Sequence, residues 1–137
     1  MKSKLTLSTL MACLIVGNVG FADPIYINVG SSVDYNAGNY SGFEITNNSQ
    51  LNINANSGDV VFDGKDAKTS RYNTALYAKD STININADKL TFQSLSDNAD
   101  AGYDNLAGWF AGNTKVNFNV NELYIGESMN SYDCGFQ

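Results

Sequence analysis

The fold of this chain is decided by the stretch STININADKLTF, residues 81–92, because two related stretches lie at a nearly constant distance from it. The preceding one is SQLNINANSGDVVF, residues 49–62, and the following one is TKVNFNVNELYI, residues 114–125. Their first residues are 32 and 33 positions apart. Repeats of this length are typical of stacked architectures, since so small a unit cannot bury its apolar face alone and packs it against the next copy.

The central copy contains two short strands separated by a corner. Residues 82–86 alternate polar and apolar, the period of a strand with one buried face, so Ile83 and Ile85 are expected to point inward. The corner interrupts this pattern, and a second alternation then buries Leu90 and Phe92. The equivalent residues of the other copies are Leu51, Ile53, Val60 or Val61 and Phe62 in the first, and Val116, Phe118, Leu123 and Ile125 in the third. The first copy requires a two-residue insertion around residues 57–58.

A third short strand is predicted before each pair. These three strands cover residues 43–45, 76–78 and 109–111, and each is followed by a polar corner. Longer loops are expected at residues 30–42, 63–74, 93–108 and 126–134. At the beginning, residues 25–29 resemble the last strand of a unit. At the end, residues 132–137 resemble residues 40–44 with one residue added, which places Phe136 in the position of Phe43.

Together these patterns predict an all-β fold, a parallel β-helix (β-solenoid) of about three coils over residues 23–137. Equivalent apolar side chains would stack into ladders at a strand spacing of about 4.8 Å. Asparagine is abundant, and it tolerates left-handed backbone at corners and can repeat its amide from coil to coil. The alternative is an antiparallel sandwich or barrel, which explains the alternation but not the preserved register.

Residues 1–22 have the features of a cleaved secretory signal peptide. Lys2 and Lys4 form a basic start, residues 5–19 are mostly apolar, and Gly20 and Ala22 place small residues before the cleavage point. The apolar stretch is shorter than the roughly 20 residues that a membrane-spanning helix needs. A membrane anchor and a lipoprotein signal at Cys13 are the alternatives.

The composition after cleavage limits the function. The 115 remaining residues suffice for one core, and six basic against fourteen acidic residues give a net charge of −8. Without a basic cluster, nucleic acid and anionic lipid are not expected as partners. The absence of histidine removes the commonest general base and zinc ligand. Cys134 is the one remaining thiol, so a disulfide partner would lie outside this sequence.

A tyrosine lies near the end of each predicted loop, and these four residues are the candidate ligand-binding residues. They are Tyr40, Tyr72, Tyr103 and Tyr132. On stacked coils the rings would lie along one edge of the tube, where exposed tyrosine suits contact with carbohydrate or protein. The alternative is that each ring folds over its own loop and closes the tube.

No catalytic residue, cofactor or metal site is predicted. The loop at residues 97–104 is acidic but lacks the ligand spacing of an EF-hand, so a solvated loop is favoured over calcium binding. Carboxylates for acid–base chemistry are available at Asp59, Asp63, Asp66, Asp88 and Asp97. Nothing in their spacing selects a pair, and Arg71 is the only arginine. The chain is therefore not expected to be an enzyme.

Several features together resemble the passenger region of Gram-negative autotransporters over residues 23–137. They are the signal peptide, the opening YAKDS at residues 77–81 with its counterpart FAGNT at 110–114, the ININAD strand and corner at 83–88, and the Asn-rich, proline-poor composition. The resemblance implies a long β-helix on the cell surface, often adhesive, followed by an outer-membrane barrel. Neither a barrel nor a capping element is present, so the chain is expected to be an N-terminal fragment whose C-terminal portion is missing.

The expected function is therefore an adhesin-like scaffold of an exported bacterial surface protein. Its partners would be a host-surface protein or carbohydrate, and its open last coil could support self-association. Its location would be the cell surface, or the periplasm for the chain alone. A small secreted β-helical carbohydrate-active enzyme and an antiparallel binding module are the alternatives from other classes.

Overall fold

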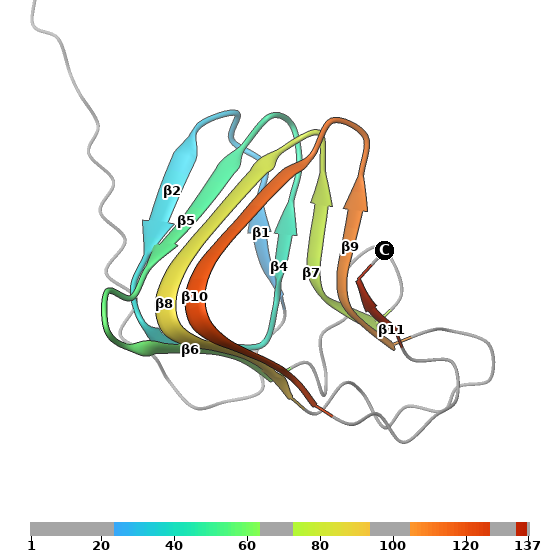
Figure 1. Cartoon of the computed structure of the whole chain (residues 1–137). Coiled ribbons are helices and arrows are strands. Elements are labelled where there is room, and N and C mark those ends of the chain that lie inside the picture. The colour runs from blue at the N-terminus through green and yellow to red at the C-terminus, as the bar shows by residue number, and fades with distance from the viewer. Residues whose placement is uncertain (1–23, 64–72, 94–104, 127–133, 137) are drawn as a thin grey trace, which may run out of the picture.

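The computed structural model describes residues 24–63, 73–93, 105–126 and 134–136, which form eleven strands and, within these ranges, no helix (Figure 1). One sheet has five strands in the order β1-β4-β7-β9-β11. These strands are β1 (Ile25–Ile27), β4 (Phe43–Ile45), β7 (Asn73–Lys79), β9 (Asn105–Ala111) and β11 (Cys134–Phe136). The predicted all-β class is confirmed.

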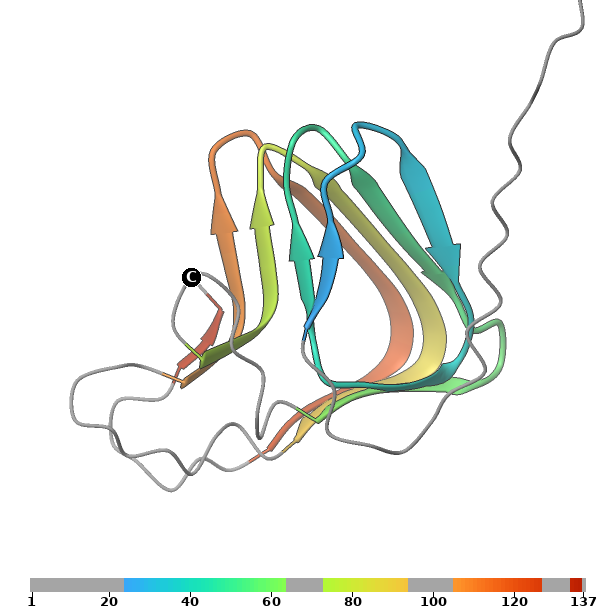
Figure 2. The same ribbon diagram turned by 180° about the vertical axis from the view of Figure 1, so that it is seen from behind.

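The other sheet is strongly curved, and we call it the curved sheet (Figures 1 and 2). Its strands are β2 (Ser32–Tyr35), β3 (Gly38–Tyr40), β5 (Gln50–Asn54), β6 (Asp59–Asp63), β8 (Thr82–Gln93) and β10 (Lys115–Ile125). The long strand β8 pairs with β5 along its first half, with β6 along its second half, and with β10 on its other side.

Every strand pair in the described part of the chain is parallel. The antiparallel sandwich or barrel is therefore wrong as an alternative. The chain forms one strand of the five-stranded sheet and then one or two strands of the curved sheet. It then returns to the five-stranded sheet, where its next strand lies beside the previous one. We call each such set of strands a level: β1-β2-β3, β4-β5-β6, β7-β8 and β9-β10, with β11 beginning a fifth. Sequence order is thus spatial order, as Figure 2 also shows.

The predicted equivalence of the three copies is confirmed in the curved sheet. Ile83 pairs in register with Leu51 on one side and Val116 on the other, and Phe92 likewise lies between Phe62 and Ile125. The two-residue insertion of the first copy is also confirmed. Residues 55–58 form a turn between β5 and β6, in which the Gly58 N–H donates to the Ala55 carbonyl at 2.8 Å.

The core lies between the two sheets and is built from these ladders. The large inward side chains of β8, together with their partners in β5 and β6, are at most 1% exposed, and the smaller Ala87 is 4% exposed. Phe92 stacks on Phe62, with ring centroids 5.0 Å apart and an interplanar angle of 12°. Burying one such side chain contributes roughly 1.5–3 kcal/mol, so each level depends on its neighbours for most of its stability.

The first level was not predicted correctly. Residues 25–27 form β1, which pairs with β4 and is therefore the first strand of a unit and not the last. Residues 30–42, predicted as a loop, contain β2 and β3, which pair with β5 and β6. Their apolar residues Val33, Tyr35 and Tyr40 are only partly buried, because a level at the end of the stack has a neighbour on one side only.

In the five-stranded sheet, the third predicted strand, residues 109–111, pairs one residue away from the predicted register. Leu76 pairs with Gly108 and Tyr77 pairs with Trp109, so Phe110 points inward and Trp109 outward. A Cβ atom at Gly108 would lie 2.6 Å from the Phe110 ring and 2.8 Å from the Phe136 ring. Glycine therefore leaves room for both rings, and its missing side chain hid the correct register. Phe136 pairs with Gly108, Gly108 with Leu76, and Leu76 with Phe43. The predicted equivalence of Phe136 and Phe43 is therefore confirmed.

The corners between the two sheets use left-handed backbone. Asn47, Asn48 and Asp80 have φ values of 59°, 53° and 50°, and Gly112 has a φ of 64°. Asparagine, aspartate and glycine tolerate this conformation better than other residues. The Asp80 carboxylate also accepts a hydrogen bond from the Asn113 N–H at 2.9 Å, which joins one corner to the next.

Candidate functional site

A row of hydrogen-bonded asparagines crosses the outer face of the curved sheet. Asn117 Nδ2 donates to Asn84 Oδ1 at 2.8 Å, and Asn84 Nδ2 donates to Asn52 Oδ1 at 2.9 Å. Asn52 Nδ2 in turn donates to Ser32 Oγ and to Asp34 Oδ1, both at 2.7 Å. The row therefore ends in the first level on a hydroxyl and a carboxylate, which both accept.

A second row lies beside the first and has the same direction. Asn119 Nδ2 donates to Asn86 Oδ1 at 3.1 Å, and Asn86 Nδ2 donates to Asn54 Oδ1 at 3.2 Å. At the following corner, Asn121 Nδ2 donates to Asp88 Oδ1 at 2.7 Å. In each of these bonds the later residue donates to the earlier one. The outer face therefore has a chemical polarity, with donors directed toward the first level.

Aromatic side chains cover the core at the first level. The Tyr40 ring lies 5.9 Å from Tyr35, 5.1 Å from Phe43 and 6.1 Å from Phe62, measured between centroids. Its hydroxyl donates to the Asn36 carbonyl at 2.5 Å. Burial raises the pKa of the Tyr40 phenol above its usual value, and the neighbouring Tyr35 adds to this rise. The Tyr35 and Tyr40 rings pack on the core at this end of the stack but stay only partly buried.

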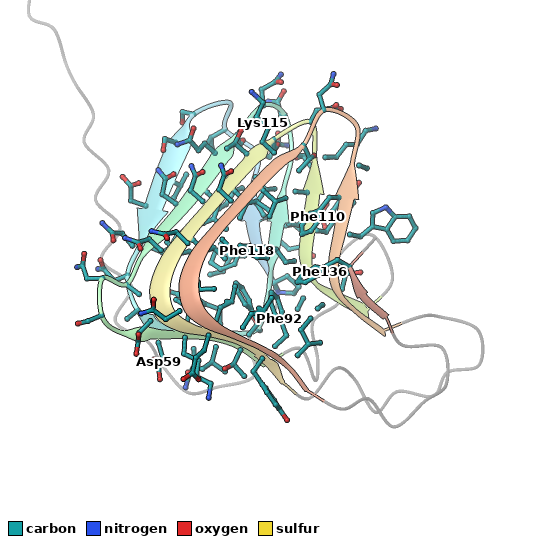
Figure 3. All side chains as sticks on the ribbon, viewed as in Figure 1. Asp59, Phe92, Phe110, Lys115, Phe118 and Phe136 are labelled. Carbon is teal, nitrogen blue, oxygen red and sulfur yellow. The ribbon has the colours of Figure 1, made fainter. Side chains whose placement is uncertain are left out.

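The opposite end of the stack leaves apolar side chains exposed. Leu123 is 47% exposed, whereas Leu90, its partner one level earlier, is fully buried. The next two pairs show the same contrast: Tyr124 at 51% against Thr91 at 8%, and Ile125 at 37% against Phe92 at 0%. Figure 3 shows Phe92, Phe110, Phe118 and Phe136 gathered inside the curve at this end. The Phe136 ring contacts the other three, with centroids 5.5–5.9 Å apart, and is itself 36% exposed.

An outward row also crosses the five-stranded sheet. In register order it consists of Tyr26, Glu44, Tyr77 and Trp109. Tyr77 is only 5% exposed although it lies outside the core cluster, and Tyr26 is 60% exposed. Tyr26, Glu44 and Trp109 all have interaction partners. The row combines aromatic faces with a carboxylate, but its central residue is covered.

The four tyrosines predicted to bind a ligand are placed as follows. Tyr72, Tyr103 and Tyr132 lie outside the described residues. Tyr40 packs on the core, as in the alternative in which the ring closes the tube. Ligand binding by the four tyrosines stays a prediction. Neither Tyr35 nor the asparagines of the rows are among the predicted site residues, although Asn at every second position of residues 52–54, 84–86 and 117–121 is a visible signal.

Of the carboxylates considered for catalysis, Asp59 and Asp88 lie near the same corner, where the Asp88 N–H donates to the Gly58 carbonyl at 3.0 Å. Asp88 accepts from Asn121, and Asp59 pairs in register with Lys89, whose Nζ lies 3.5 Å from Glu122 Oε2. Asp66, Asp97, Arg71 and the acidic loop at 97–104 lie outside the described residues. Over the described ranges, no three His, Cys, Asp or Glu side chains are grouped so that they would hold a metal ion.

In the described part of the chain, no helix has the length and apolarity required to cross a membrane. Comparison with protein-family models, with curated proteins and with solved structures finds no match to this chain.

Proposed function

We propose that the stacked levels form a parallel β-helix that serves as a non-catalytic, adhesin-like scaffold of an exported bacterial surface protein. The observation that carries the proposal is the unbroken in-register stacking of β5, β8 and β10, with apolar ladders inside and asparagine rows outside. Such a stack gives an elongated, regular outer surface, which suits contact with a large partner better than it suits the binding of a small substrate.

The proposed partner is a protein or carbohydrate of a host surface. Two kinds of group on the outside support this choice. The asparagine rows repeat amide donors and acceptors at the strand spacing, and the outward row on the five-stranded sheet supplies aromatic rings beside Glu44. Glycans and protein surfaces are both recognised by combinations of amides and aromatic rings.

The β-helical stacking can be tested by disulfide mapping. Asn52 and Asn84 lie opposite each other on adjacent parallel strands about 4.8 Å apart, within the Cα separation that a disulfide spans. The variant N52C/N84C with C134S should therefore form a disulfide under mild oxidation. N52C/N86C is the matched control, because a two-residue offset places its Cα atoms about 8 Å apart. Crosslinking of the control in preference to N52C/N84C would refute the stacking.

The surface function needs a separate test. The whole chain is expressed in a Gram-negative host, and the exported product is expected to begin at Asp23. The purified protein is then added to cultured host cells and to a glycan array. Saturable binding is expected, without cleavage of the glycans. Absence of binding to both would overturn the proposal. So would cleavage of a polysaccharide, measured as new sugar chain ends, if D59N or D88N abolished that cleavage. The second result would favour the carbohydrate-active enzyme.

A further inference from the structure

The edge of β10 that faces away from β8 is the strongest unexplained feature of the described residues. The Lys115 N–H donates to the Ser81 carbonyl at 2.9 Å, toward β8. Backbone groups alternate in direction along a strand, so those of Val116, Phe118 and Val120 point to the other edge. No described strand pairs with β10 there. The same three side chains are only partly buried.

The asparagine rows determine which side chains a strand bound at this edge must carry. Asn117 and Asn119 each use Nδ2 to donate to the preceding level, and Asn121 donates to Asp88. Their side-chain oxygens are therefore the acceptors at the end of each row. Continuing the rows requires a donor above each of these oxygens, and an amide side chain supplies one while keeping an oxygen for the next level.

A second copy of this chain stacked head to tail does not meet that requirement. In the first level, the residue in register with Asn52, Asn84 and Asn117 is Asp34. A copy stacked by its first level onto β10 would place the Asp34 carboxylate over the Asn117 oxygen, and an ionised carboxylate only accepts hydrogen bonds.

The five-stranded sheet shows where a strand added to β10 would lie. β11 pairs with β9 and so extends this sheet one level beyond β10. Phe136 of β11, in the level after β10, contacts Phe118 of β10 with ring centroids 5.8 Å apart. A strand added to β10 would therefore lie beside β11 and complete its level.

We propose that the outer edge of β10 binds a parallel β-strand that places asparagine side chains over Asn117 and Asn119 and apolar side chains over Val116 and Phe118, which makes it one further level of the repeat. The inference rests on the parallel stacking and is independent of the proposed surface function. Leu123 and Ile125 would then become buried like their partners Leu90 and Phe92.

The first test adds the strand as a peptide. The probe is a synthetic peptide with the sequence of residues 81–93, STININADKLTFQ, which already fits β10 from the other side in the fold. The readout is hydrogen exchange of the Val116, Phe118 and Val120 amides. The peptide should slow their exchange at least about tenfold, and a peptide carrying Asn84→Asp and Asn86→Asp should bind at least about fivefold more weakly, since it lacks both donors.

The second test supplies the level covalently, in case the peptide aggregates. Phe136 is in register with Gly108 and Gly108 with Leu76, so a copy of residues 78–93 attached directly after Gln137 continues the register. This extension should raise the unfolding midpoint and protect the same three amides. The extension with both asparagines changed to aspartate should give a clearly smaller rise.

Three results would overturn the proposal. One is unchanged exchange of the β10 amides with both the peptide and the extension. Another is equal binding of the asparagine and aspartate peptides, which would exclude recognition through the amide rows. The third is concentration-dependent protection of β10 in the unmodified chain with a stable dimer in sedimentation, which would assign the edge to a second copy. None of them bears on binding to host cells or glycans.

Discussion

Phe92 lies parallel to Phe62 with their ring centroids 5.0 Å apart, although the two residues are separated by 30 positions in the chain. Phe92 is fully buried, and Ile125 occupies the same place one level later with 37% exposure. F92A should therefore destabilise the protein by about 3–5 kcal/mol in denaturant titration. I125A is the matched control and should cost less than half as much. Equal losses would contradict the burial gradient along this ladder.

The asparagine rows can be tested by removing one donor. Asn84 both donates to Asn52 and accepts from Asn117, so N84D replaces a donor by a carboxylate that faces another oxygen. We expect a loss of about 1–2 kcal/mol in unfolding free energy. Asn54 accepts from Asn86 at the end of its row, and N54D keeps that acceptor. N54D should be nearly neutral, and a loss as large as that of N84D would argue against the rows.

Stability should depend on pH through Tyr40. Because burial raises the pKa of its phenol in the folded state, the folded state holds this proton more tightly than the unfolded state does. The resulting stabilisation is fully present below the unfolded pKa of about 10 and is lost as the pH rises through the folded value. Unfolding of the natural protein and of Y40F should be compared between pH 8 and 11.5. The natural protein should lose stability more steeply above pH 10, and parallel curves would contradict this prediction.

The corner at Gly112 is a further point of sensitivity. Its φ is 64°, and a Cβ atom there would meet the Asp80 carboxylate, which also holds the Asn113 N–H. G112A should therefore cost at least about 1 kcal/mol, measured by thermal or chemical unfolding. The double variant G112A/D80A should lose less than the sum of the single variants, because the alanine side chain at position 80 relieves the clash. Strict additivity would show that the carboxylate is not the obstacle.

The sequence predicted the middle of the stack better than its ends. Ile83 and Phe92 have neighbours on both sides, so the alternation of β8 carries a strong signal that both adjacent copies repeat. Tyr35 and Tyr40 have a neighbour on one side only, and their strands are rich in the glycine, serine and asparagine of loops. The alternation of apolar and polar residues is a weaker signal in a terminal level, because its inward side chains are covered on one side only.

The composition indicated repeated asparagine amides, but it did not predict the geometry of the asparagine rows. The abundance of asparagine indicated repeated amides, whereas the direction of donation depends on which atoms Asp34 and Asn117 present at the two ends. Gly108 likewise gave no sign that its ladder position would be filled by the rings of Phe110 and Phe136. Such relationships arise from side chains on different levels and have no counterpart in local sequence spacing.

The two tyrosines at the first level have a kinetic consequence. Because Leu123 and Ile125 of β10 are more exposed than the inward Tyr35 and Tyr40 at the other end, the strands should fray from β10 inward. Amide exchange should therefore be fastest in β10, slower in β8 and slowest in β5, which forms a gradient along the axis. A stack of this kind would respond to force or protease at the β10 end first, and β5 would be the last of these three strands to open.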